Sequence, residues 1–546
     1  MRLGELLLER KLITAEDLDR ALELQKERGD KLGKTLVDLG FIAMRDVLAA
    51  LSDQLNVPLV TIEGPPAASP ETDTLSPKFL RQFRCLPLDR VDHTVTLAMA
   101  DPLDFETIAA VRNCTGLRVN TVLAAEQEIL DAIDRYYGES AKAEGEYAAE
   151  GGEAAEDLEH LRDMASEAPV IRLVNSIIAQ AVEKRASDIH IEPFEREFRV
   201  RYRIDGVLIN QDSPPREMKA AMISRVKLMA KLNIAERRLP QDGRIKIKSL
   251  GREIDLRVST LPTLFGESVV MRLLDRSATD FYDLGRLGFD GHMFRRMEHF
   301  TSMPHGIFLV TGPTGSGKST TLYSALKRIN QSDKKIITIE DPVEYQMDGI
   351  NQIHVNTQIG LTFASGLRHI VRQDPDVIMI GEIRDRETAD IAIRASLTGH
   401  FVYSTLHTND APSAISRLTD MGVENYLITS SLVAVLAQRL VRVVCTHCKE
   451  SAGYRMTPEG DNIETFRGHG CERCFGTGYT GRIGIFEMME LDDEIRKMIM
   501  AKADATEITS AARRNGMRNL REDGWLKVRS GATSADEVMR VTQEFV

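Results

Sequence analysis

The chain has 546 residues, too many for one hydrophobic core, and this length predicts about three to five domains. Its hydrophobic content of 42% and charged content of 28% are ordinary for a globular protein, and no run reaches the ~18 apolar residues that a membrane-spanning helix needs. A net charge of −12 argues against a general nucleic-acid binder, which needs a basic face. Charges interrupt the amino-terminal stretch, so it lacks the apolar core of a secretory signal, and we expect a cytosolic protein.

The first 60 residues contain an internal repeat. One copy opens at Arg2-Leu3-Gly4 and the other at Lys31-Leu32-Gly33, an offset of 29 residues that also relates Ile13 to Ile42, Leu22 to Leu51 and Gln25 to Gln54. Helical spacing of apolar residues predicts two helices in each copy. With a mixed α/β segment over 75–137, the repeat is predicted to form an N-terminal domain spanning 1–137.

Residues 138–167 are rich in Ala, Glu and Gly and carry ten acidic and two basic side chains. Such a segment buries too little apolar surface to fold alone, so it is predicted to be an acidic flexible linker. An apolar helical stripe and a strand of alternating polarity then predict a second α/β domain over 168–285. Over 286–440, short apolar strands alternate with helices, which predicts a mostly parallel sheet covered by helices.

The strongest motif fits the P-loop pattern GxxxxGK[ST], with a predicted strand before it and a helix after it. Its glycines let backbone N–H groups face phosphate oxygens. In this pattern Lys318 reaches the β- and γ-phosphates and Ser319 holds Mg²⁺. The predicted nucleotide-binding residues are Gly312, Pro313, Thr314, Gly315, Ser316, Gly317, Lys318, Ser319 and Thr320.

Hydrolysis also needs carboxylates near the phosphates, and two acidic residues end predicted strands. Glu340 follows the strand 336–339, and Glu382 follows the strand 377–380. His400 and His407 bracket a further strand, and strand ends surround the ligand crevice in such sheets. Arginines that could neutralise the transferred phosphoryl group, as an alternative to ordinary ion pairing, are Arg257, Arg272, Arg368 and Arg372.

Four of the six cysteines form two CxxC pairs, Cys445 with Cys448 and Cys471 with Cys474, separated by 22 residues. Four thiolates at this spacing suit a tetrahedral structural Zn²⁺, with a redox pair as the alternative. We therefore predict a zinc-binding element over 441–481, followed by a helical region over 482–546.

The motifs GPTGSGKST, ITIEDPVEY, LRHIVRQDPDVIMIGEIRD and TGHFVYSTLHTND resemble, in order, the Walker A, Asp box, Walker B and His box of secretion ATPases of the GspE and PilB type. The resemblance covers about residues 165–490. It implies an α/β chain with a RecA-like P-loop core, a preceding α/β domain, an N-terminal helical or α+β domain and a zinc knuckle.

The resemblance further implies that Glu340 activates water, that Glu382 organises Mg²⁺, and that His400 and His407 sense the γ-phosphate. The four arginines are expected around the phosphates, some supplied by a moving domain or a neighbouring subunit. The implied activity is ATP hydrolysis by a cytoplasmic homo-hexamer that drives a type II secretion pseudopilus. The alternative is the PilB-type assembly of a type IV pilus.

Other implications concern partners and regulation. The family's partners are inner-membrane platform proteins, a GspL-like cytoplasmic domain and a GspF-like protein, so we expect a peripheral membrane location and no nucleic-acid substrate. The N-terminal repeat is similar to a cyclic-di-GMP-binding domain, although Lys11 and Lys31 replace its usual Gly and Arg. A helical docking domain is the alternative there. A scaffold with a purely structural ATP site and a nucleic-acid motor are the alternatives for the whole chain.

Overall fold

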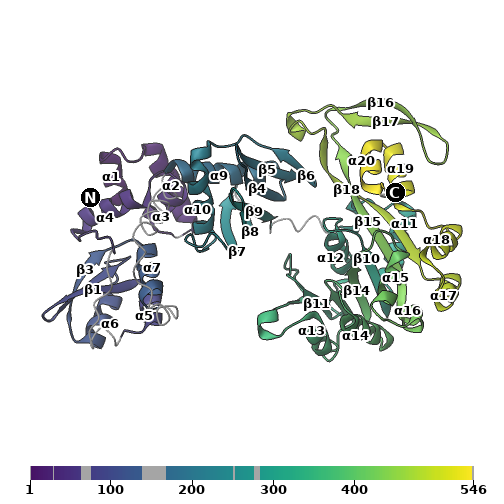
Figure 1. The fold of residues 1–546 in the computed structure, drawn as a ribbon, viewed down its shortest axis with the longest axis horizontal. Coiled ribbons are helices and arrows are strands. Elements are labelled where there is room, and N and C mark those ends of the chain that lie inside the picture. Colours follow the sequence, from purple (N-terminus) through teal and green to yellow (C-terminus); the bar gives the residue numbers. More distant parts are fainter. Residues whose placement is uncertain are drawn as a thin grey trace. The chain divides into compact units, whose positions relative to one another are not determined.

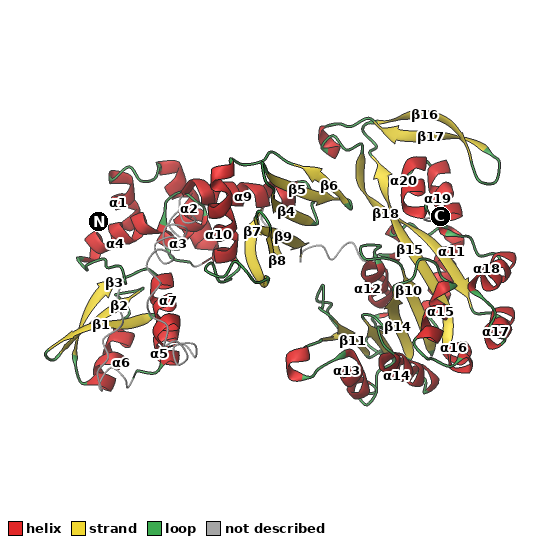
Figure 2. Cartoon of the chain, viewed as in Figure 1, coloured by secondary structure: helices red, strands yellow, loops and turns green. Residues whose placement is uncertain are grey.

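The computed structural model of the chain describes residues 2–28, 30–62, 75–137, 168–249, 252–275 and 283–543 (Figures 1 and 2). The predicted acidic linker lies outside these ranges. The chain divides into two compact units, the first comprising Met1–Tyr202, Ile209–Leu250 and Leu256–Leu273, and the second Arg203–Leu208, Gly251–Asp255 and Leu274–Val546. Within the described ranges, no helix combines the length and apolar character required to cross a bilayer.

The first unit opens with the predicted helical repeat. Its elements are α1 (Leu3–Glu9), α2 (Ala15–Arg28), α3 (Leu32–Asp38) and α4 (Met44–Leu55). Equivalent glycines make equivalent contacts: an added Cβ at Gly4 would lie 2.8 Å from Leu18 Cδ1, and one at Gly33 would lie 2.7 Å from Val47 Cγ1. The two copies therefore pack their helices in the same way, and the repeat in sequence is a repeat in structure.

The turn after the first helix of each copy requires a left-handed residue. Gly40 has a φ of 73° and Lys11, 29 positions earlier, has a φ of 57°. Glycine adopts this conformation without steric cost, whereas lysine adopts it only at a steric cost. The departure from the family pattern at Lys11 therefore changes the side chain and keeps the turn.

The segment after the repeat forms a small α/β layer, as predicted. Strands β1 and β2 are antiparallel and β2 and β3 are parallel, in the order β1-β2-β3. The elements are α5 (Pro77–Phe83), β1 (Cys85–Val91), β2 (Thr94–Met99), α6 (Phe105–Thr115), β3 (Arg118–Leu123) and α7 (Glu126–Tyr137).

A six-stranded sheet in the order β6-β5-β4-β9-β8-β7 comes next along the described residues. Its elements are α9 (Ala168–Glu183), β4 (Asp188–Pro193), β5 (Phe198–Ile204), β6 (Val207–Asn210), α10 (Lys219–Met229), β7 (Gln241–Ser249), β8 (Arg252–Thr263) and β9 (Gly266–Asp275). Phe198, Val200 and Tyr202 are buried while the arginines between them are partly exposed, as the alternation predicted.

The second unit is built on a seven-stranded sheet in the order β12-β11-β13-β14-β10-β15-β18. All its pairs are parallel except β15 with β18. The elements up to the last helix before β15 are α11 (Gly291–Thr301), β10 (Gly306–Thr311), α12 (Lys318–Ile329), β11 (Ile336–Glu340), β12 (Asn351–His354), α13 (Phe363–Ile370), β13 (Val377–Ile380), α14 (Arg386–Leu397), β14 (Phe401–Leu406), α15 (Ser413–Asp420) and α16 (Asn425–Ser431).

Helices cover both faces of this sheet, so its strands are apolar throughout. On β10, Ile307 and Leu309 join the core beneath α13 to α18, whereas Phe308 and Val310 join the core with α11 and α12. The prediction of a parallel sheet covered by helices is confirmed.

The carboxyl-terminal part differs from the helical region predicted over 482–546. It opens with β18 (Tyr479–Glu490), which pairs with β15 (Leu432–Val444), a strand that crosses the expected boundary at residue 440. Burial between β10 and β18 holds this apolar run as a strand, and a local pattern cannot supply that information. The remaining elements are β16 (Lys449–Met456), β17 (Asn462–Gly468), α17 (Asp493–Met500), α18 (Ala505–Arg514), α19 (Leu520–Arg529) and α20 (Ala535–Thr542).

Candidate nucleotide site and cysteine cluster

The P-loop connects β10 to α12 at the carboxyl edge of the sheet. Its three glycines have positive φ angles, 145° at Gly312, 81° at Gly315 and 89° at Gly317. Side chains other than glycine rarely adopt these angles, so the spacing of the motif is a backbone requirement. Helix α12 begins at Lys318, so its free N–H groups add positive potential at the loop.

Lys318 lies inside this loop. Its Nζ donates hydrogen bonds to the carbonyl oxygens of Gly312, at 2.8 Å, and Pro313, at 3.1 Å. Burial lowers the pKa of the ammonium, and the nearby carboxylate of Glu382 opposes that shift. The lysine is thus held at the phosphate-binding loop with an acidic residue close by.

Glu382 and His407 meet at the same edge. Glu382 follows β13 and His407 follows β14, and these parallel strands are neighbours between β11 and β10. The Nε2 atom of His407 lies 3.3 Å from Oε2 of Glu382, whose other oxygen accepts a hydrogen bond from Arg384. The structure therefore places Lys318, Glu382 and His407 together, as the strand ends predicted.

Glu340 ends β11 at this edge and is only 5% exposed. Its carboxylate accepts hydrogen bonds from the hydroxyl of Tyr323, from Thr338 Oγ1 at 2.6 Å and from Gln352 Nε2 at 3.3 Å. Burial raises its pKa, and these donors oppose the shift. These three donors to Glu340 were not predicted from the sequence. In this arrangement Glu340 anchors the loop after β11, and its predicted role in activating water stays a prediction.

The structure does not bring His400 to this edge. It precedes β14, beside the start of β10, and its Nδ1 lies 2.8 Å from the carbonyl oxygen of Ala395. Because β10 and β14 are parallel, His400 sits at the amino edge, opposite the P-loop. The expected γ-phosphate contact from His400 therefore does not fit the P-loop of its own chain.

The four predicted arginines fall in both units. Arg368 bonds to Glu387, and Arg372 lies 2.7 Å from Nδ1 of His369, both in the second unit. Arg257 on β8 and Arg272 on β9 belong to the first unit, where Arg272 Nε donates to Asp188 at 3.0 Å. Their predicted phosphate contacts stay predictions.

The four predicted metal ligands converge at the end of β15. The Sγ atoms of Cys445, Cys448, Cys471 and Cys474 all lie within 4.8 Å of one another. Backbone N–H groups of Cys471 and Gly478 donate to Cys474 Sγ at 3.1 and 3.2 Å, which stabilises a thiolate. Four mutually close sulfurs with N–H donors fit a tetrahedral structural metal site.

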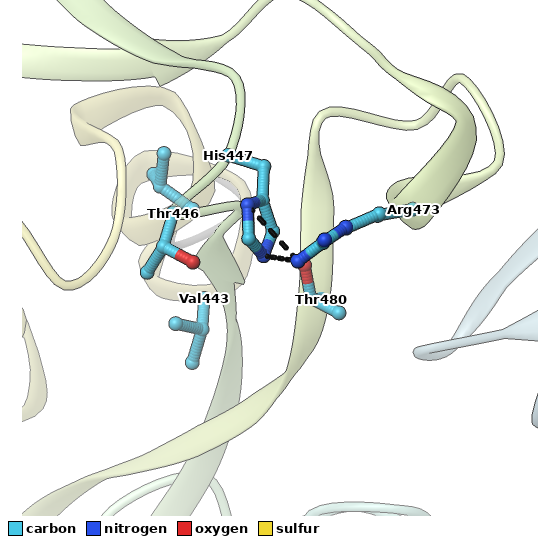
Figure 3. Close-up of a pocket in the computed structure, with 6 residues that line it drawn as sticks. Val443, Thr446, His447, Arg473 and Thr480 are labelled. Atoms are coloured by element: carbon cyan, nitrogen blue, oxygen red, sulfur yellow. Dashed lines mark hydrogen bonds between the residues drawn. The ribbon is translucent and has the colours of Figure 1, made fainter.

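A cavity of about 430 Å³ adjoins this cluster (Figure 3). It is lined by Val443, Val444, Thr446, His447, Arg473 and Thr480. Arg473 and His447 point toward one another, with the guanidinium nitrogen 2.6 Å from Nε2. Both residues lie between paired cysteines, so this recess belongs to the metal element and not to the P-loop edge.

Comparisons with known proteins agree with this geometry. The model of the family described as "Type II/IV secretion system protein" matches residues 163–540, and an MshEN domain model matches 55–143. The chain is 51% identical to a Type II secretion system protein E of Xanthomonas campestris, covering 100% of this chain and 98% of the relative. It is 44% identical to the type IV pilus assembly ATPase PilB of Myxococcus xanthus, covering 98% of each.

Among solved structures, the Legionella pneumophila ATPase DotB matches with a TM-score of 0.50 at 22% identity, over 67% of this chain and 94% of that one, which supports the fold. The fold and the P-loop edge define a P-loop ATPase. The chain belongs to the Type II/IV secretion system protein family, and the predicted resemblance, fold class and ATPase activity are confirmed.

Proposed function

We propose that this chain hydrolyses ATP to drive assembly of a type II secretion pseudopilus, and hence protein export across an outer membrane. The observation that carries the proposal is the meeting of Lys318, Glu382 and His407 at one edge of the sheet. It is supported by 51% identity along the whole chain to a Type II secretion system protein E. A structural ATP site would not need this acidic and imidazole pair beside the P-loop lysine.

In this proposal the P-loop binds the phosphates, Ser319 and Glu382 hold Mg²⁺, and His407 responds to the γ-phosphate through Glu382. Glu340, which ends β11, or Glu344, in the loop that follows, orients the attacking water. Arginines reach the phosphates when units close or subunits assemble. ATP binding then closes domains and hydrolysis releases them, a cycle that converts chemistry into movement.

The working form is a homo-hexamer in the cytoplasm, held at the inner membrane through a GspL-like cytoplasmic domain and a GspF-like platform protein. A ring gives a role to Arg368 and Arg372, which are exposed on α13 and on the segment after it. It would let one subunit complete the site of the next.

The four cysteines are proposed to hold a structural Zn²⁺. The thiolates fill all four positions of a tetrahedral site, so the metal stabilises the loop at the end of β15 and takes no part in hydrolysis. For the N-terminal domain we propose cyclic-di-GMP as a regulator, supported by the repeat and by the MshEN match over 55–143.

The second candidate is a type IV pilus assembly ATPase, favoured by 44% identity to PilB over 98% of each chain. In the organism that encodes this chain, the Lys318→Ala allele would separate the two. Loss of exoprotein secretion with normal surface pili supports the first proposal, and the reverse outcome supports the second.

The biochemical test compares Mg²⁺-dependent ATPase activity of the full-length protein with Lys318→Ala and Glu382→Gln. We expect the ATPase activity of both variants to fall at least ~100-fold, which corresponds to an activation barrier about 2.7 kcal/mol higher. If the assembled wild-type protein turns over ATP no faster than the variants, the P-loop is a structural site and the proposal is refuted.

A further inference from the structure

Gln438 on β15 lies directly beneath the P-loop. Thr311, the last residue of β10, pairs with Ala437, so Gln438 comes next, where the loop leaves the sheet. The glutamine is only 2% exposed. An added Cβ at Gly312 would lie 2.5 Å from the Gln438 carbonyl oxygen, and one at Gly317 would lie 2.7 Å from its Nε2. The backbone of the loop therefore rests on this residue at two glycines.

Both ends of the Gln438 amide are used. Its Nε2 donates to the carbonyl oxygen of Ser316 at 2.9 Å, and its Oε1 accepts from Thr321 Oγ1 at 2.7 Å. A carbonyl can only accept, so the nitrogen must face Ser316 and the oxygen must face Thr321. Thr321 is fully buried on α12, so it fixes the orientation of the amide.

This hydrogen bond sets the direction of a phosphate-binding donor. The N–H and C=O of a trans peptide point in opposite directions. Holding the Ser316 carbonyl inward on Gln438 therefore directs the Gly317 N–H outward, to the side of the loop where phosphates bind.

We infer that Gln438 is a positioning residue that preorganises the P-loop for the phosphates of the nucleotide. The inference rests on the proposed function of this loop. Without the glutamine the Ser316–Gly317 peptide is free to rotate, and part of the free energy of nucleotide binding is then used to order it. Removal of Gln438 therefore weakens nucleotide affinity more than it lowers kcat.

The test uses the full-length protein with Gln438→Met, which keeps the shape of the side chain and removes both hydrogen bonds. We expect the Kd for Mg²⁺-ATPγS and the KM for ATP to rise about 10-fold, about 1.4 kcal/mol, with kcat changed less than about 3-fold. Thr321→Val should raise Kd about 3-fold, and the double variant should match Gln438→Met because Thr321 acts through the glutamine.

Ser324→Ala is the matched control. Ser324 is buried on the same helix and bonds to the Thr320 carbonyl at 2.8 Å without contacting Gln438. Unchanged affinity in Gln438→Met, an equal rise in Ser324→Ala, or additive losses in the double variant would overturn the inference. If Gln438→Met does not fold, the inference is tested by comparing the Kd of Thr321→Val with that of Ser324→Ala. A wild type that binds no better than Lys318→Ala would refute the proposed function instead.

Discussion

The Nε2 atom of His407 lies 3.3 Å from the Glu382 carboxylate, and this pair joins the ends of β13 and β14 beside the P-loop lysine. If a bound phosphate brought Mg²⁺ to Glu382, the carboxylate that pairs with His407 would bind the metal as well, and its contact with the histidine would change. The pair can therefore report the occupancy of the site to the loop that follows β14.

We expect His407→Gln to lower kcat about 100-fold, because a positioned polar group at a phosphoryl-transfer site contributes on that scale. His400→Gln is the control at the amino edge of the same strand and should change kcat less than about 3-fold. Steady-state ATPase assays of the assembled protein measure both. Equal losses would show that the distinction between the two edges is wrong.

The second prediction separates Glu340, at the end of β11, from Glu344, in the loop that follows. Glu340 is buried under three donors, whereas Glu344 is half-buried and water can reach it more readily. We expect Glu344→Gln to lower kcat at least ~100-fold with an unchanged melting temperature. Glu340→Gln should lower the melting temperature in addition to kcat, because the hydrogen bonds that hold the loop after β11 are weakened.

Tyr323→Phe tests the anchor without touching either carboxylate. It removes one donor to Glu340 and should lower the melting temperature with a smaller loss of kcat. If Glu340→Gln abolishes turnover and keeps wild-type stability, Glu340 is the base and Glu344 is not.

The third prediction concerns pH. Glu487 on β18 accepts the N–H of Ala411 at 2.8 Å, and burial raises its pKa to about 7. A carboxyl whose folded pKa is raised binds more protons when folded, so its contribution to stability falls as the pH rises from about 4.5 to about 7. Glu487→Gln cannot ionise, so it should gain up to about 3 kcal/mol relative to wild type across that window.

The single tryptophan provides the measurement. Trp525 is 7% exposed on α19 in the second unit, so its fluorescence during urea unfolding follows the unit that contains Glu487. Glu459→Gln, at an exposed position, is the control and should show no pH-dependent difference. A constant difference between Glu487→Gln and wild type from pH ~5 to ~8 would contradict the prediction.

The fourth prediction is metal content. The purified protein should carry one zinc per chain, measured by elemental analysis, and Cys448→Ser should lose it and lower the melting temperature. Cys114→Ser removes an exposed cysteine outside the cluster and should keep the metal. A chain that holds no zinc, with a disulfide within each CxxC pair, would favour the redox alternative.

The fifth prediction uses the left-handed turn at Lys11. Lys11→Gly removes the steric cost of a φ of 57° and should stabilise α1 and α2 by about 1 kcal/mol, seen as slower hydrogen exchange in both helices. Lys26→Gly, within α2, should destabilise the helix by about 1 kcal/mol. Destabilisation by Lys11→Gly as well as by Lys26→Gly would show that the turn carries no strain.

Much of the site follows from local sequence because strand ends of a parallel sheet share one edge. Lys318, Glu382 and His407 were predictable on that basis, and so was the cysteine cluster from its spacing. The support of Glu340 by Tyr323 and of the P-loop by Gln438 was not. These contacts join segments distant in the chain, and Gln438 sits in an apolar run whose strand character depends on its neighbours.

Strand β15 runs from Gln438 to Val444 beside β18, with one irregularity in the pairing between Arg442 and Val444, and Cys445 follows at once. At about 3.3 Å per residue, the P-loop support and the cysteine cluster are some 23 Å apart along one hydrogen-bonded strand. The support of the P-loop and the cysteine cluster are thus joined by one strand, so a displacement at the cysteines has a direct backbone path to Gln438.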